Sequence, residues 1–224
     1  MLLIIGFLIA MSLFAETGGI FFRLLGALND QPTFGYSMHV RFATVGRFFI
    51  FFAAPALGFI VDSLNSAKSI AIIGFVAFLI HFLLCVIIIL TRGDLFNFLY
   101  HRVSKNNMIN RLEFQSIKTF NRPSDKNFYL LSSLAFFTTA IGLLTVNLLA
   151  TIFVNYRATI IQSSAIITAI GTVVHVFFID PKLAISGDID VRLLYLLVGD
   201  FWNARMLISL LLCLIFSAII LFLS

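Results

Sequence analysis

Charged residues are scarce in this sequence of 224 residues. Asp, Glu, Lys and Arg together make up 11% of the chain, whereas soluble domains hold about a quarter. Hydrophobic residues make up 61%, and the mean hydropathy is +1.08. This shortage of charge excludes an ordinary soluble domain, so the sequence indicates an integral membrane protein.

Cysteine and catalytic motifs are also nearly missing. The two cysteines, Cys85 and Cys213, lie inside apolar runs without the spacing of a metal or redox site, so we expect them to be small buried hydrophobes. No GxSxG, HExxH or Walker-type loop occurs. We therefore expect a protein that is not an enzyme and that has no cofactor and no metal site.

Phenylalanine is abundant, with 27 residues against one tryptophan and five tyrosines. Because Phe lacks the polar tip that suits the membrane interface, most of this aromatic bulk is expected to face lipid or neighbouring helices. The net charge of +5 then belongs to loops, and we expect no nucleic-acid partner.

Six runs are long and apolar enough to cross a membrane as helices, which takes about twenty residues each. The predicted fold is therefore all-α, a polytopic membrane protein with a single domain over residues 1–224. The first run lacks a basic start, so we expect it to be a helix of the mature protein rather than a signal peptide. The expected spans are Leu2–Leu28, Val40–Val61, Ser69–Leu90, Tyr129–Val154, Ala158–Ile179 and Leu193–Leu223.

The longest loop, about residues 92–128, lies between the third and fourth spans and is basic. By the positive-inside rule it is cytoplasmic, which places both termini outside. Within it, four apolar residues at helical spacing predict either a helix lying on the inner leaflet or a solvated linker. These residues are Leu95, Phe98, Leu99 and Val103.

Lysines and arginines are distributed differently. All five lysines lie in predicted loops, whereas five arginines lie within or at the ends of spans. A guanidinium stays ionised when desolvated and binds phosphate or carboxylate through two parallel hydrogen bonds. Each charge within the membrane costs at least ~2.5 kcal/mol, so each should have a partner or face water. The five arginines are Arg23, Arg41, Arg47, Arg157 and Arg205.

Polar residues recur on one face of two predicted spans. Spacings of three, four and seven residues keep side chains on the same side of a helix. Such stripes are typical either of the wall of a polar passage or of tight helix contacts through small residues. The stripe of the fifth span is Arg157, Ser164, Thr168, Thr172 and His175, and that of the second is Arg47, Ala54, Gly58 and Asp62.

Several motifs follow one another in order along the chain. They are RLLG at 23–26, GRFF at 46–49, APALGFIVD at 54–62, YRATIIQSSAIITAIGT at 156–172 and FIDPKLAISGD at 178–188. The most specific block contains polar residues recurring in order through one apolar helix. Together these motifs resemble those of the Amj-type lipid II flippases, six-span bacterial proteins that serve as an alternate to the MurJ flippase.

The resemblance implies a flippase of the bacterial cytoplasmic membrane that acts in peptidoglycan and cell-wall synthesis and so in cell shape. Its partners would be membrane lipids and lipid II, whose diphosphate joins a polyprenyl tail to a sugar-peptide head. The cost of taking that hydrated anion through hydrocarbon is the barrier such a protein must lower. Whether six spans act alone or as a homodimer stays open, as does the energy source.

On this interpretation, each polar group has an expected role. Arg23 and Arg41 capture the diphosphate at the inner leaflet, and Arg47 and Arg157 receive it further out. The remaining roles are hydroxyls that replace water (Ser164, Thr168, Thr172), carboxylates that pair with arginines in the absence of substrate (Glu16, Asp62, Asp180) and a hinge (Pro55, Gly58).

Other functions stay open at this point. One alternative is a membrane phosphatase or transferase of polyprenyl-diphosphate metabolism, for which Asp180, Asp188 and Asp190 are the acidic candidates, although their spacing favours a solvated turn. Further alternatives are a transporter of another polyprenyl-linked glycan and a scaffold subunit. No role follows from the sequence for Asp200 or Arg205.

Overall fold

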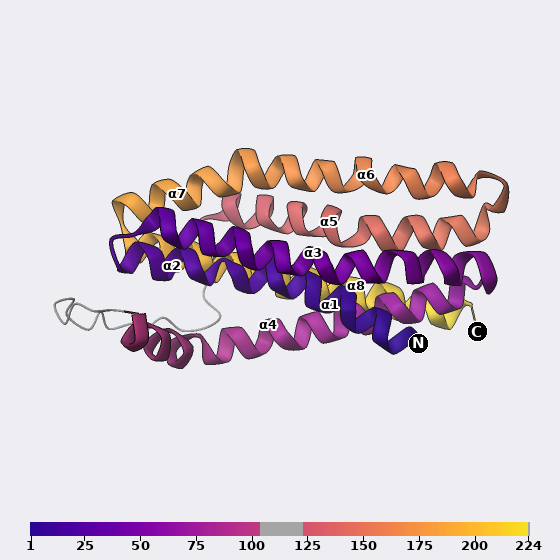
Figure 1. Ribbon diagram of the computed structural model, residues 1–224, viewed down its shortest axis with the longest axis horizontal. Coiled ribbons are helices and arrows are strands. Elements are labelled where there is room, and N and C mark those ends of the chain that lie inside the picture. The colour runs from indigo at the N-terminus through magenta and orange to yellow at the C-terminus, as the bar shows by residue number, and fades with distance from the viewer. Residues whose placement is uncertain (104–122, 224) are drawn as a thin grey trace.

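The computed structural model describes residues 1–103 and 123–223, with side chains described at 1–94 and 123–223. Its regular structure is helical throughout these residues (Figure 1). Six helical segments are long and apolar enough to cross a membrane, which confirms the predicted all-α, six-span class. These segments are Leu2–Leu28, Pro32–Ser63, Ala67–Asp94, Lys126–Ile152, Val154–Ile189 and Val191–Phe222.

The spans are built from helices α1 to α8, joined by one 3₁₀ turn, η2, and one π-helical turn, η3. Their bounds are α1 (Leu2–Gly19), α2 (Phe21–Leu28), α3 (Pro32–Ser63), α4 (Ala67–Val103), α5 (Lys126–Ile152), η2 (Val154–Tyr156), α6 (Arg157–Val174), η3 (His175–Ile179), α7 (Asp180–Ile189) and α8 (Val191–Phe222).

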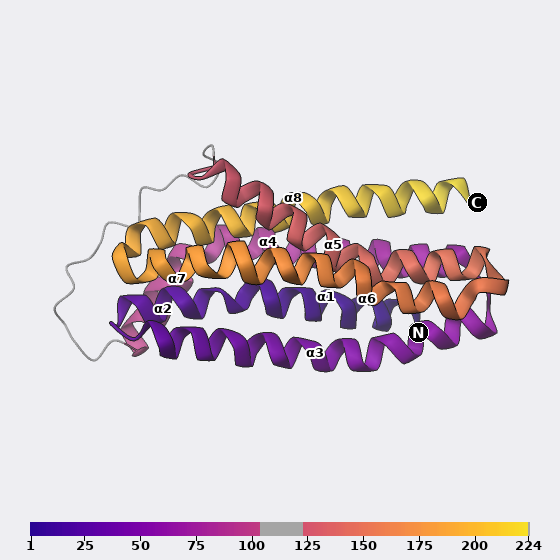
Figure 2. The same ribbon diagram turned by 90° about the horizontal axis from the view of Figure 1, so that it is seen from above.

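Consecutive spans run antiparallel along the long axis of the bundle (Figure 1). Both termini consequently lie at one end, and the connection of α2 to α3 and that of α7 to α8 lie at the other (Figures 1 and 2). We refer to these as the terminal end and the opposite end. The positive-inside rule predicts that the opposite end is cytoplasmic, and this orientation stays a prediction.

The predicted start of the second span is wrong. We expected it near Val40, but α3 already begins at Pro32. Proline suits the first helical turn because the backbone N–H that it lacks would have no partner there. The turn is confined to the residues just before it, where Asp30 has a φ of 53°.

The segment that follows the fifth predicted span is also helical rather than a loop. The π turn η3 leads directly into α7, with Pro181 in its first turn. α7 packs against α8 and α2, and Leu183 and Ser186 are buried there. The expected acidic turn at Asp180 and Asp188 is therefore wrong, because both residues belong to this helix.

Helix α4 continues to Val103, so the predicted loop begins later than residue 92. Helical structure at Leu95–Val103 agrees with the expected periodicity. Whether that segment lies on a leaflet surface depends on side chains at 95–103 and on residues 104–122, which lie outside the described residues.

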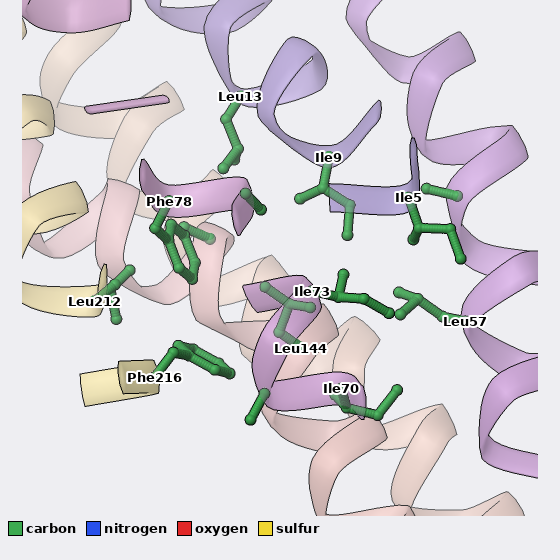
Figure 3. Packing of buried hydrophobic residues seen from close by; sticks show 14 of the residues in the cluster. Ile5, Ile9, Leu13, Leu57, Ile70, Ile73, Phe78, Leu144, Leu212 and Phe216 are labelled. Atoms are coloured by element: carbon green, nitrogen blue, oxygen red, sulfur yellow. The ribbon is translucent and has the colours of Figure 1, made fainter. Parts of the chain in front are cut away.

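Two buried apolar clusters hold the bundle together. The first contains residues of α1, α3, α4, α5 and α8, including Phe78, Leu144 and Phe216 (Figure 3). The second joins α2, the middle of α4, the first half of α5, η3, α7 and the first half of α8, with Trp202 among its largest members. α1 and α8 contribute to the interior, whereas α6 and α7 lie along one edge of the bundle (Figure 1).

Helices α2 and α3 approach closely at a pair of glycines. A Cβ atom on Gly35 would lie 2.5 Å from the carbonyl oxygen of Phe22 and 2.8 Å from Cα of Gly26. Distances this short require the backbones to separate, because backbone atoms cannot turn aside as a flexible side chain can. The two glycines thus fix the position of α2, and with it the position of Arg23.

We expect Gly35→Ala to destabilise the protein by about 1–3 kcal/mol through overpacking. Gly58→Ala is the matched control, because no atom lies within 4 Å of a Cβ there and alanine favours an exposed helix by roughly 0.5–1 kcal/mol. Thermal unfolding of the detergent-solubilised variants measures the difference. Equal melting temperatures for the two variants would contradict close packing at Gly35.

Candidate functional site

Arg23 of α2 is buried at the opposite end of the bundle, with 6% of its surface exposed. Its Nη2 donates to Oδ1 of Asp180 at 2.5 Å, and its Nε donates to Nδ1 of His39 at 2.8 Å. Because a guanidinium can only donate, Nδ1 of His39 must be the unprotonated nitrogen. Arg23 thus connects the first, second and fifth spans.

Two further side chains complete this opposite-end cluster of Arg23, Tyr36, His39, His175 and Asp180. The ring of Tyr36 lies 4.6 Å from the Arg23 guanidinium carbon. Nε2 of His175 lies 3.4 Å from Oδ1 of Asp180. Residues five apart share a face in a π turn, so η3 is what places His175 beside Asp180. Sequence periodicity assigned His175 to the α6 stripe and gave no signal for this contact.

A second arginine cluster lies at the terminal end. Nη1 of Arg157 donates to Oδ1 of Asp62 at 3.0 Å, and its Nη2 donates to Oδ1 of Asn65 at 2.7 Å. The Arg157 side chain is 20% exposed and that of Asp62 is 71% exposed. This pair joins the start of α6 to the end of α3 in a position open to solvent or lipid headgroups.

The fifth span is therefore tied at both ends by an arginine–aspartate pair. Between those ends it packs along α5, and only 6% of its most apolar window is buried, compared with 28–56% for the other spans. Among the described residues its contacts with the first and second spans are few, so the two ion pairs form a large share of its attachment to those spans.

Arg41 and Arg47 of α3 differ from these buried or paired arginines. Both side chains are exposed, and the described residues provide neither with a hydrogen bond or an ion pair. They lie six residues apart, which is about 9 Å along a helix. Two ionised groups within a membrane span that lack protein partners need water or an anionic ligand.

The hydroxyls of α6 are directed to their own helix. Thr168 donates to the carbonyl oxygen of Ser164 at 2.8 Å, and Thr172 donates to that of Thr168 at 3.0 Å. Gly142 of α5 packs closely against Thr168, since a Cβ on this glycine would lie 3.1 Å from its Cγ2. Part of the predicted stripe thus serves helix contact, while the hydroxyl oxygens keep lone pairs that can accept hydrogen bonds.

The residues predicted as a hinge lie on an open face of α3. Pro55 is exposed within the continuous helix, and no atom lies within 4 Å of a Cβ at Gly58. Because proline removes one backbone hydrogen bond, α3 has a point of lower stiffness there. This point lies between Arg47 and Asp62.

Asp200 holds the start of α5 against α8. Its Oδ2 accepts hydrogen bonds from the backbone N–H groups of Ser124, at 2.9 Å, and Asp125, at 3.2 Å, and from the Ser124 hydroxyl. Asp125 in turn is hydrogen-bonded to Lys182, and the Lys182 ammonium holds the pKa of the Asp125 carboxyl below its ordinary value. Sequence reasoning gave Asp200 no role, because these contacts join distant segments.

Glu16 does not pair with the arginines that we expected. Its Oε2 lies 3.6 Å from Nη1 of Arg205, a residue of α8 that is 3% exposed. His81, which sequence reasoning missed, is fully buried in the same region. An arginine in the middle of an apolar run, such as Arg205, indicates a polar contact within the membrane, whereas a lone histidine such as His81 gives no such indication.

Metal ligation and known relatives provide no further assignment. In the part of the chain with described side chains, no group of three or more His, Cys, Asp or Glu residues is placed to hold a metal ion. No protein-family model, curated protein or solved structure matches the chain.

Proposed function

We propose that the protein is a flippase that moves a polyprenyl-diphosphate-linked glycan from the inner to the outer leaflet of a bacterial cytoplasmic membrane, and that this substrate is lipid II. The observation that carries the proposal is two exposed arginines, Arg41 and Arg47, on one membrane-spanning helix, neither of which has a partner among the described residues. The resemblance of the ordered motifs to the Amj-type flippases supports the choice of substrate.

Diphosphate is the anion that this arrangement suits best. It carries two negative charges, whereas a carboxylate carries one, and arginine binds phosphate oxygens through two parallel hydrogen bonds. Arg41 and Arg47 lie about 9 Å apart along the helix and roughly 120° apart around it, so the two guanidinium groups would contact the diphosphate one after the other as it moves outward. The polyprenyl tail needs no protein pocket, because it can stay among the lipid tails on the Phe-rich exposed surface of α3. Exposed members of that surface are Phe42, Phe48, Phe51, Phe52 and Phe59.

The two arginine–aspartate pairs suggest how binding changes the helix arrangement. A diphosphate that contacts Arg23 competes with Asp180, and one that contacts Arg157 competes with Asp62. Each exchange of partners releases one end of the fifth span from the first or second span, with which it makes few other contacts among the described residues. Substrate at the inner leaflet would thus free one end and substrate at the outer leaflet the other, so that binding shifts the population between two arrangements.

The hydroxyls of α6 and the less stiff point of α3 near Pro55 fit the same exchange of ion-pair partners. Ser164, Thr168 and Thr172 follow one face of α6 between the two arginine clusters and offer oxygen lone pairs to sugar hydroxyls. Bending near Pro55 lets the outer part of α3 follow α6 while the Arg157–Asp62 pair persists.

The test is rescue of a bacterial strain depleted of its lipid II flippases. Expression of the wild-type chain is expected to restore growth and to expose lipid II on the outer leaflet. Membrane expression without either effect would contradict lipid II as the substrate. Exposure of a different polyprenyl-linked glycan in those cells would retain the arginine-based mechanism with another head group.

A further inference from the structure

A buried polar cluster lies at the meeting point of α1, α4 and α8, apart from both arginine clusters described above. We call Glu16, Thr17, His81, Arg205 and Ser209 the central cluster. Thr17, His81 and Ser209 are 0% exposed, and Arg205 is 3% exposed. The Glu16 side chain is 40% exposed, and among the described residues it is the one member of the cluster that reaches the protein surface.

The guanidinium of Arg205 has few partners for a buried cation. Nη1 donates to Oγ1 of Thr17 at 3.2 Å and lies 3.6 Å from Oε2 of Glu16. Nε is buried and has no hydrogen-bond partner. The rings of Phe201 and Phe136 lie 4.1 and 4.9 Å from the guanidinium carbon. Glu16 is thus the carboxylate that balances this charge, and a buried charge that loses its partner is strongly destabilised.

His81 connects the cluster through a chain of four contacts. The Thr17 hydroxyl lies 2.8 Å from the Leu13 carbonyl oxygen and 3.0 Å from Nε2 of His81, and the Ser209 hydroxyl lies 2.6 Å from Nδ1 and 2.8 Å from the Arg205 carbonyl oxygen. Four contacts need four hydrogens, but two hydroxyls and a neutral imidazole supply three.

In a neutral chain one of the four contacts is therefore always without a hydrogen, and which contact this is depends on the tautomer of His81 and on the direction of the two hydroxyls. In one arrangement, the Thr17 hydroxyl donates to its own helix and Ser209 donates to the imidazole. In another, Thr17 donates to the imidazole and Ser209 donates to the Arg205 carbonyl. A change at Arg205 can shift this balance, because Arg205 contacts Thr17 directly. The cluster thus links three helices through hydrogen bonds that have more than one neutral arrangement.

We propose that the central cluster is a proton-binding centre, in which Glu16 takes up the proton and Arg205 and His81 convey the change to α8 and α4. Proton uptake forms an O–H bond on Glu16 and removes the negative charge beside Arg205. A ligand larger than a proton would require the helices to separate, because every other member of the cluster is buried.

The charged and titratable groups around Glu16 are few. α8 provides Arg205, and α4 provides His81 together with Cys85, whose Sγ lies 3.7 Å from Nε2 of His81. α3 provides His39, whose ring packs against Gly19 of α1. Since no second carboxylate joins the ion pair of Arg205 in the described part of the chain, neutralising Glu16 cannot be compensated within the cluster.

This inference rests on the proposed function, because it makes proton movement the energy source of lipid transport. Protonation would weaken the attachment of α1 to α8 and let the first and last spans separate, with the opposite effect on deprotonation. Binding of a proton by the central cluster can nevertheless be measured without any transport substrate.

Trp202 provides that measurement, because it is the single tryptophan of the chain. It is 2% exposed, and its Nε1 donates to the Thr17 carbonyl oxygen at 3.0 Å. Its ring also stacks on Phe21 at a centroid distance of 6.1 Å. Indole emission depends on hydrogen bonding and local charge, so Trp202 emission reports on the state of the central cluster.

The experiment is a pH titration of Trp202 emission in wild-type proteoliposomes, Glu16→Gln and Asp188→Asn. Asp188 is the matched control because it is an exposed carboxylate on α7, away from the cluster. We expect a reversible change of emission on acidification in the wild type and in Asp188→Asn, and its loss in Glu16→Gln. No change in the wild type, or an equal change in Glu16→Gln, would overturn the proposal.

Glu16→Asp keeps the experiment decisive if Glu16→Gln does not fold. The shorter carboxylate is further from Arg205, so the midpoint of the emission change should shift relative to the wild type, and an unshifted midpoint would overturn the proposal. Failure of the flippase is separately visible as absence of lipid transport at every pH. A pH-dependent emission that Glu16→Gln abolishes would then still establish the proton centre.

Discussion

Arg47→Ala is expected to reduce transport of the diphosphate-linked lipid by about ten- to hundredfold, since hydrogen bonds to a charged group contribute about 1.5–3 kcal/mol and each 1.4 kcal/mol is a factor of ten. Arg47 is exposed on α3 and has no partner among the described residues, so its removal breaks no ion pair of the folded protein. The effect should appear in transport and leave the melting temperature nearly unchanged.

Two comparison variants separate binding geometry from simple charge. Arg47→Lys keeps the positive charge but loses the planar fork, so transport should fall between wild type and Arg47→Ala. Arg192→Ala is the matched control, because Arg192 is also exposed but lies at the start of α8, outside the proposed path. Rates of lipid II exposure at equal expression measure the effect. Full transport by Arg47→Ala would remove Arg47 from the mechanism.

Asp180→Asn is expected to lower the free energy of unfolding by about 3 kcal/mol, at the lower end of the range for breaking one partner of a buried pair. The buried Arg23 would keep its contacts with His39 and Tyr36 but lose its carboxylate. The lower end applies because Asp180 is 22% exposed, so water can replace part of the lost interaction.

Asp62→Asn makes the same chemical change at the other end of the fifth span. Asp62 is 71% exposed, and exposed ion pairs contribute about 0–1 kcal/mol, so this variant should be nearly as stable as the wild type. Unfolding in detergent by heat or denaturant gives both values. Equal losses of unfolding free energy in Asp180→Asn and Asp62→Asn would contradict the claim that the Arg23–Asp180 pair is stronger because it is more buried.

The number and class of the helices could be predicted from the sequence, because about twenty apolar residues per span is a local property. Their ends were harder to place. The second span begins at Pro32 rather than near Val40, because proline suits the first turn of a helix. The α7 segment contains Pro181 and Gly187, residue types that favour a turn, and it is nevertheless helical. A proline indicates where a helix can begin or break, and only packing against neighbours decides which.

The arginines could be identified from the sequence, but their partners could not. Arg23 and Asp180 lie 157 positions apart in the sequence. The pairing of Arg157 with Asp62 follows from two helices that meet at one end of the bundle. The missed pair of Glu16 with Arg205 has the same cause, because hydropathy places a residue along a span but does not say which helix it faces.

The most direct test of the central claim is flipping of a fluorescent lipid II analogue by the purified protein in liposomes, followed by reaction of the outer-leaflet label with a membrane-impermeant quencher. The wild-type protein should bring nearly all of the label within reach of the quencher, whereas Arg41→Ala/Arg47→Ala should leave about half protected, as in protein-free liposomes with the label in both leaflets. Equal access for wild type and the double variant would contradict transport through these arginines.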